Sequence, residues 1–183
     1  MKISKRMLAV CLVSAAVLSG MTLLHANAQT APMTSQQIER IRNNCISVKS
    51  TLNQLHVSDA LLRVNMGQIY ESMSTKLMEK FNSRVASNGF SNINLVSVTT
   101  NYGLMLDAFR SDYIIYEAQL SSALNINCSN QPVVFYDTVS SARAKRNQVH
   151  ADVVRLDQYI NQYQSVVNQF EKDYQAAANG AKQ

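Results

Sequence analysis

The sequence predicts an all-α fold, an elongated antiparallel three-helix bundle with coiled-coil-like heptad packing, placed after an N-terminal signal peptide. Three observations predict it. The 183 residues include only five Gly, two Pro and no Trp, a composition that disfavours β architecture. Apolar residues recur at alternating intervals of three and four over long stretches. Turn-forming runs at 88–89 and 127–132 divide these stretches into three segments of similar length.

The first 28 residues have the three zones of a bacterial-type signal peptide. The basic head comprises Lys2, Lys5 and Arg6, and the apolar run comprises residues 7–24. The small-x-small cleavage site consists of Ala26 and Ala28 before Gln29. An uncleaved anchor is the alternative, because an apolar run of about 18 residues can cross a bilayer. We expect cleavage and export to the periplasm, the cell surface or the medium. Without cleavage, residues 7–24 would hold the protein in a membrane.

Cleavage changes both the charge and the cysteine content of the chain. It removes three of the 17 basic residues and none of the 12 acidic ones, which leaves a net charge of +2. No Lys/Arg cluster on the scale of a nucleic-acid footprint remains, so we expect no nucleic-acid partner. Cys11 leaves with the leader, and two cysteines stay in the mature chain.

The first helix is expected over 35–88, after a short flexible N-terminus at 29–34. Thr34 or Ser35 is its predicted cap, and Gly89 permits the left-handed turn that ends it. Residues 56–59 put an acid into the apolar stripe and offer Ser58 as a second cap, but the unchanged heptad phase favours one continuous helix. The stripe expected to face the core comprises Ile38, Ile41, Cys45, Val48, Leu52, Leu55, Leu62, Met66, Ile69, Met73, Leu77, Phe81 and Val85.

The second and third helices are expected over 92–126 and 132–177, followed by a flexible tail at 178–183. Pro132 suits the first turn of a helix. Short connections favour antiparallel neighbours and a bundle about 60 Å long. Two apolar series in strict heptad phase predict coiled-coil-like packing of the third helix. They are Phe135, Ala142, Val149, Leu156, Tyr163 and Phe170, and Val139, Arg146, Val153, Ile160, Val167 and Tyr174.

Two cysteines in an exported protein predict a disulfide between Cys45 and Cys128. If the first hairpin folds about residue 90, Cys128 lies about two helical turns from the level of Cys45, within reach of a loop. The alternative is two unpaired thiols, with Cys45 filling a core position of the stripe.

A second predicted contact joins two polar residues in the apolar stripes, Asp59 and Arg146. The idealised bundle places Asp59 near the level of residue 145, so we predict an ion pair that fixes the alignment of the helices. The alternative is that both side chains reach water.

Other acids are expected to be solvated, and tyrosines to place their rings at the core edge and their hydroxyls in water. These acids are Glu71, Glu79, Asp107, Asp112, Glu117, Asp152 and Asp157; the tyrosines are Tyr102, Tyr113, Tyr116, Tyr136, Tyr159, Tyr163 and Tyr174.

The sequence offers no catalytic or cofactor-binding pattern. His56, Ser58 and Asp59 are sequence neighbours, which does not give the geometry of a catalytic triad. The mature chain's two cysteines and two histidines have unrelated spacings that do not suit zinc. We therefore expect no enzyme activity, cofactor or metal.

Export, strict heptads and the missing catalytic groups favour a structural or protein-interaction module of the cell envelope. Such a module is a rigid helical spacer or docking surface, with a protein partner or self-association. The alternative is an extracytoplasmic holdase-type chaperone that binds unfolded clients, which the methionines and tyrosines of the long helices suggest and the low net charge disfavours.

Overall fold

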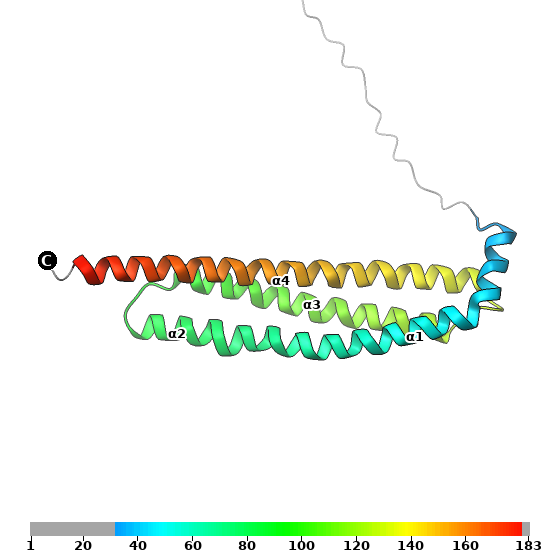
Figure 1. The fold of residues 1–183 in the computed structure, drawn as a ribbon, viewed down its shortest axis with the longest axis horizontal. Coiled ribbons are helices and arrows are strands. Elements are labelled where there is room, and N and C mark those ends of the chain that lie inside the picture. The colour runs from blue at the N-terminus through cyan, green and yellow to red at the C-terminus, as the bar shows by residue number, and fades with distance from the viewer. Residues whose placement is uncertain (1–31, 181–183) are drawn as a thin grey trace, which may run out of the picture. The chain divides into compact units, whose positions relative to one another are not determined.

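The computed structural model describes residues 32–180 of the chain. Its helical elements are α1 Ser35–Ser72, the π-helix η1 Met73–Met78, α2 Glu79–Ser87, α3 Ile93–Asn125 and α4 Pro132–Gly180. The first three are consecutive and form one rod, α3 runs back beside it, and α4 returns in the direction of the first rod (Figure 1). The predicted all-α antiparallel three-helix bundle is thereby confirmed. The predicted leader, with Ala26, Ala28 and Gln29, lies outside the described residues.

The first rod begins and ends with the local signals expected for it. The Thr34 hydroxyl accepts a hydrogen bond from the Gln37 backbone N–H (3.3 Å), and the Gln37 side chain accepts one from the Thr34 N–H (2.8 Å). At the other end, Gly89 has a φ of 76°, and the Phe90 N–H donates to the Val85 carbonyl oxygen. The Phe90 ring lies against the aromatic rings of α4 near residue 174, so α4 spans the whole length of the first rod.

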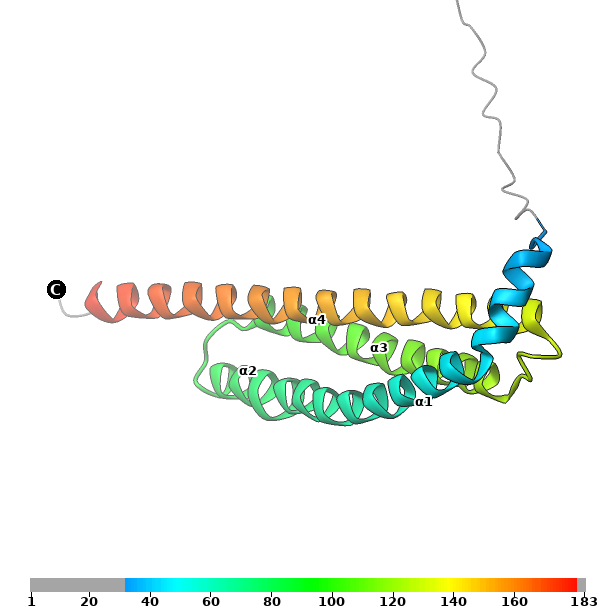
Figure 2. The ribbon, with the colours of Figure 1, turned by 45° about the vertical axis from the view of Figure 1, so that its right-hand side comes forward.

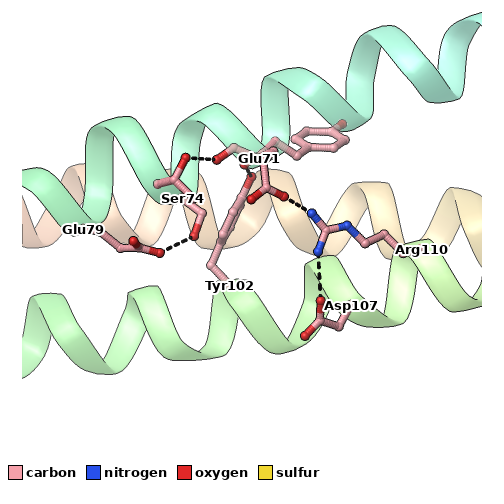
Figure 3. Close-up of polar contacts among 8 residues, drawn as sticks. Glu71, Ser74, Glu79, Tyr102, Asp107 and Arg110 are labelled. Atoms are coloured by element: carbon pink, nitrogen blue, oxygen red, sulfur yellow. Dashed lines mark hydrogen bonds and ion pairs between the residues drawn. The ribbon is translucent and has the colours of Figure 1, made fainter.

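The first rod is helical through residues 56–59, and its irregularity lies further along, in η1. Tyr70, Ser74, Met78 and Asn82 are buried at intervals of four residues. Such intervals drift around an α-helix of 3.6 residues per turn, and the wider π turn offsets that drift. The hydroxyl of Tyr102 (Figure 3) donates to the Tyr70 carbonyl oxygen (2.9 Å), three residues before η1, and so joins α3 to the first rod beside the irregular turn.

Part of the stripe predicted for the first rod is wrong. Leu62, Ile69 and Leu77 are 55%, 50% and 53% exposed, whereas Asp59 and Tyr70 are buried. A strict seven-residue repeat drifts by about 20° per heptad on a straight α-helix, so the face that contacts the other helices moves to neighbouring positions. Met66, Met73, Phe81 and Val85 still pack in the core, so beyond residue 55 only part of the extrapolated stripe leaves it.

Helix α4 follows its predicted pattern more closely. Phe135, Ala142, Leu156 and Tyr163 are all buried, as expected for the first heptad series. The helix continues to Gly180, so the predicted tail is helical over 178–180. Alanine at positions 176–178 has the highest helix propensity and accounts for this extension.

A disulfide ties the start of α1 to the loop between α3 and α4. The first turns of α1 lie at an angle to the rest of the helix and cross the beginning of α4 (Figures 1 and 2). There the sulfur atoms of Cys45 and Cys128 are at bonding distance, with their Cα atoms 5.5 Å apart. Arg42 and Lys49 each donate to a backbone carbonyl oxygen of the loop region at 3.2 Å. We call this contact, which packs on Phe135, the disulfide clasp.

Candidate functional site

A groove of about 450 Å³ runs between α1 and α4, with side chains of α3 at its base; we call it the α1–α4 groove. Its walls are mostly apolar. The apolar lining comprises Leu62, Met66, Phe109, Val149 and Val153. The polar lining comprises Asp59, Arg63, Tyr70, Tyr113, Tyr116, Arg146, Asn147 and His150. The groove therefore combines the two residues of the predicted polar pair with three tyrosines.

The predicted partners Asp59 and Arg146 lie together in this groove. The Arg146 guanidinium donates from Nε to Asp59 Oδ2 (2.7 Å) and from Nη2 to Oδ1 (3.1 Å). A third member, Tyr116, was not predicted for this pair; its hydroxyl donates to Asp59 Oδ2 at 2.7 Å. Asp59 is 8% exposed, and the Arg146 side chain is 49% exposed. The acid is thus buried, while its cation reaches water.

The hydrogen bonds keep Asp59 ionised despite its burial. Burial alone would raise the pKa of Asp59. The hydrogen bonds from Arg146 and Tyr116, with the positive charge of Arg146, outweigh burial and hold the pKa below its ordinary value. The same carboxylate raises the pKa of Tyr116, in addition to the effect of that hydroxyl's own burial. At neutral pH the cluster consists of a carboxylate, a guanidinium and a neutral phenol.

Two other tyrosines of the groove have hydroxyls without a partner. Tyr70 and Tyr113 are 2% and 4% exposed, and neither hydroxyl makes a hydrogen bond within the described part of the chain. The Arg63 guanidinium lies over the Tyr113 ring, 5.2 Å from its centroid. Among residues 32–180, Arg63 makes no ion pair. Tyr70 was absent from the tyrosines singled out by sequence.

The expectation that the tyrosine hydroxyls reach water is wrong for the core tyrosines. Tyr102 and Tyr163 are buried, and the Tyr163 hydroxyl bonds both the Met78 carbonyl oxygen (3.1 Å) and Asn82 Oδ1 (2.7 Å). Burial raises the pKa of Tyr163 to about 12. These hydroxyls join the helices through internal hydrogen bonds and are unavailable to a ligand.

A network of ion pairs lies beside η1. Arg110 of α3 pairs with Glu71 of α1 and, at 3.0 Å, with Asp107 (Figure 3). The three side chains are between 43% and 74% exposed. Exposed pairs of this kind contribute about 0–1 kcal/mol each, so we assign the network a minor structural role.

One acid expected to be solvated is instead fully buried. Asp152 of α4 is 0% exposed; its Oδ1 accepts a hydrogen bond from Gln148 (3.1 Å), and its Oδ2 has no donor within the described residues. Burial and the neighbouring Asp112 carboxyl of α3 raise the pKa of Asp152. Asp152 lies outside the two heptad series predicted for α4, beside Asp112 of α3.

Replacing Asp152 with Asn is expected to stabilise the protein at neutral pH. The folded-state pKa of Asp152 is raised, so the folded protein holds the neutral carboxyl better than the ionised one. The contribution of Asp152 to the free energy of unfolding is therefore present in acid and is lost as pH rises through the folded-state pKa. The amide keeps the shape and removes the charge beside Asp112. Thermal unfolding at pH 7 should give a higher Tm for Asp152→Asn, and the gain should vanish in acid. The exposed control Asp137→Asn should leave Tm unchanged, and a lower Tm for Asp152→Asn would contradict this account.

The exposed surface of α1 carries no charged residue over a long stretch. Between Arg42 and Lys76, the charged side chains are buried or partly covered, as Asp59 and Arg63 are. We call the exposed residues of 43–69 the uncharged outer face, about 40 Å long by the helical rise. They are Asn43, Asn44, Ile46, Ser47, Val48, Ser50, Thr51, Asn53, Gln54, Val57, Ser58, Leu61, Leu62, Val64, Asn65, Gln68 and Ile69.

Large apolar side chains are exposed on this face. Ile46 is 86% exposed, and Val57, Leu61 and Val64 are 56%, 63% and 48% exposed. Spacings of four and three place the last three on one side of α1, opposite the buried positions. Helix α4, in contrast, exposes charges along most of its length, including Arg143, Lys145, Arg155 and Asp157. Charge depletion combined with apolar side chains is the composition of an interface core.

The described residues offer little for other classes of site. His56 lies 3.7 Å from Glu117, and Ser58 is on the outer face, so neither completes a triad with Asp59. Within residues 32–180, no three His, Cys, Asp or Glu side chains gather as metal ligands, and no helix has the length and hydropathy to cross a bilayer. The fold and its surfaces define the chain as a disulfide-containing helical bundle with a tyrosine-lined groove and an uncharged helix face. No protein family, curated protein or solved structure matches it.

Proposed function

We propose that this chain is an exported protein-interaction module of the cell envelope, a rigid helical support that docks onto a partner through the uncharged outer face of α1. The observation that carries the proposal is that no charged residue of 43–69 is fully exposed, since Lys49 and Arg63 are partly covered and Asp59 is buried, together with half-exposed Val57, Leu61 and Val64. The leader-like N-terminus supports export, and the paired cysteines are compatible with an oxidising compartment.

The composition of the face indicates the chemistry of the partner. Apolar residues spaced at four and three match the anchors of a helix that packs along another apolar helix. A strongly charged partner would have to desolvate its charges against a face that offers only amide and hydroxyl groups. The partner surface should therefore be an apolar helix face of low charge. Apart from Leu62 at the rim of the groove, the groove is lined by other residues of α1, and the side that exposes Val57, Leu61 and Val64 stays accessible.

Leu61→Glu is expected to abolish docking without unfolding the protein. Leu61 is 63% exposed, so the new carboxylate is solvated in the free protein and becomes buried without a partner in the complex. The measurement is the size of the tagged protein in a native extract of the envelope, by size exclusion with light scattering. We expect the wild type to elute in a larger species and Leu61→Glu to elute at the size of the free chain.

The matched control is Leu104→Glu on α3, because Leu104 is 66% exposed and lies outside the face. It should elute as the wild type does. Equal behaviour of Leu61→Glu and the wild type would refute docking through this face. The purified protein distinguishes the kind of partner: if it forms the same larger species alone, the partner is a second copy of the chain, and otherwise it is a different protein.

A holdase-type chaperone is the second candidate, and the distribution of exposed apolar residues favours it. Leu104, Ile114 and Ile115 of α3 and Val133, Val134 and Val154 of α4 are also exposed, so apolar contacts are available on all three rods. A holdase should suppress aggregation of an unfolded client, and substitutions at Leu61 and Leu104 should weaken that suppression equally. A docking module should lose function at Leu61 alone.

A further inference from the structure

The lining of the α1–α4 groove carries one positive charge without a counterion. Its charged members are Asp59, Arg63 and Arg146, and the first and last of these neutralise each other through two hydrogen bonds. When His150 is neutral, Arg63 is left as the net charge of the lining. A ligand that binds here gains from carrying a single negative charge.

The same groove contains two hydrogen-bonding groups that the described fold does not use. The Tyr70 and Tyr113 hydroxyls are buried and unpartnered, and both residues line the groove. An unpartnered buried hydroxyl lowers stability, so two of them in one groove need an explanation. Beside a guanidinium, phenolic O–H groups favour a ligand that offers acceptor oxygens.

We infer that the α1–α4 groove binds a small molecule in which one carboxylate is attached to an apolar group, such as a medium-chain fatty acid. The carboxylate pairs with Arg63 and accepts hydrogen bonds from Tyr70 and Tyr113. The apolar group lies against the walls formed by Met66, Phe109 and neighbouring valines. This binding activity is additional to docking by the outer face and does not depend on it.

The size and charge of the groove support this ligand class. Small-molecule sites have volumes of roughly 300–1,000 Å³ and are mostly apolar with a few placed polar groups, and the groove has about 450 Å³. A phosphate monoester would bring more negative charge than Arg63 offsets, and an ammonium group would be repelled. The half-exposed Leu62 forms part of the rim and gives an apolar chain a path to the interior.

Binding requires side-chain movement at both hydroxyls, because the Tyr70 and Tyr113 oxygens are both shielded from water in the free protein. The Tyr113 hydroxyl is shielded from water in the free protein, and Arg63 lies over its ring. When Arg63 turns toward a carboxylate, the guanidinium leaves that ring and the hydroxyl becomes accessible. The chain has eight Tyr and no Trp, so tyrosine fluorescence follows binding without a tryptophan signal, and the part of the change lost in Tyr113→Phe belongs to Tyr113.

The test is a titration of the purified protein with octanoate, octanol and octylammonium, followed by tyrosine fluorescence and calorimetry. The three probes share one apolar chain and differ in headgroup charge. We expect octanoate to bind at least about tenfold more tightly than the other two, as one charge-assisted hydrogen bond provides. Equal affinity for the three probes, or no binding of octanoate, would overturn the inference.

Variants of the groove residues test the assigned roles. Tyr70→Phe and Tyr113→Phe remove only the hydroxyls and should each weaken octanoate binding by about fivefold or more, while Tm stays equal or rises. Arg63→Gln should abolish the preference for octanoate over octanol. Unchanged octanoate affinity in the Phe variants, or a lower Tm, would mean that the hydroxyls have a structural role and would refute the site.

The outer face provides the control that separates the two proposals. Leu61→Glu, on the opposite side of α1, should bind octanoate as the wild type does. If Leu61→Glu loses docking and keeps octanoate binding, the two activities are independent. If Leu61→Glu also loses octanoate binding, the ligand occupies the outer face and the groove assignment is wrong.

Discussion

Replacing Cys45 and Cys128 together with serine is expected to lower the free energy of unfolding by about 4 kcal/mol, the loop-entropy value for a crosslink between residues so far apart. The two positions are separated by 83 residues, and the bond crosses from α1 to the loop that precedes α4. Both cysteines are buried against Phe135. For a domain of this size, the loss corresponds to a Tm lower by about 10 °C.

The loss of stability should appear first in the first turns of α1 and only then in the unfolding of the whole bundle. The clasp holds only the first turns of α1, so hydrogen exchange in the serine variant should accelerate over 35–51 while α3 and most of α4 remain protected. Reduction of the wild type should reproduce the lower Tm, and the reductant should leave the Tm of the double serine variant unchanged. A wild type whose Tm does not respond to complete reduction would contradict a stabilising bond.

Asp59→Ala is expected to lower the free energy of unfolding by about 2–3 kcal/mol, and Tm by roughly 5–10 °C. The variant leaves the buried Tyr116 hydroxyl without its acceptor and Arg146 without its anion. The estimate is below the usual loss for a buried pair because Arg146, 49% exposed, can turn into water. Asp107→Ala, which breaks a fully surface pair of similar length, should cost less than about 1 kcal/mol.

The Asp59 contribution has a defined pH dependence. Because the folded-state pKa is lowered, the stabilisation is fully present above the ordinary carboxyl value of 3.8 and is lost as pH falls through the lower folded-state pKa. Urea unfolding of wild type and Asp59→Ala should therefore give a constant difference from pH 7 to about pH 5. The difference should shrink in acid, and a difference that grows there would show that Asp59 is not held as a carboxylate.

The polar pair illustrates what the sequence could predict. Asp59 and Arg146 both interrupt apolar stripes, and counting residues from the two short turns places them at one level. Register and level follow from counting residues, so the partner of Asp59 could be inferred. The third member, Tyr116, could not, because which of several tyrosines on α3 reaches the acid depends on the rotation of α3 about its axis.

The errors also come from rotation about the helix axis. The stripe extended through Ile69 and Leu77 assumed a constant seven-residue repeat, and the buried face instead follows Tyr70, Ser74 and Met78. The sequence contained one indication that the buried face changes here: Met73, Leu77 and Phe81 are spaced at intervals of four instead of alternating three and four. Asp152 was missed because it lies outside the two heptad series predicted for α4, and its burial beside Asp112 of α3 depends on how α4 is rotated about its axis.

The uncharged outer face was partly visible in the sequence. Residues 50–69 contain only two charged side chains, Asp59 and Arg63. These two charges make the face look charged in the sequence, but in the structure Asp59 is buried and Arg63 lies over the Tyr113 ring. Composition alone therefore indicates a stretch of low charge. The packing of α1 decides which residues of that stretch are exposed and so whether they form an uncharged surface.

Docking by the outer face is tested most directly by a photo-crosslinking scan in intact cells, with one reactive residue at a time across residues 53–69 and at the control position 104. The account predicts adducts to one partner species at positions 57, 61 and 64, and none at buried positions or at Leu104. This periodicity would reproduce the exposed side of α1. Adducts of equal yield at positions 61 and 104, or a pattern unrelated to the helical repeat, would contradict docking through this face.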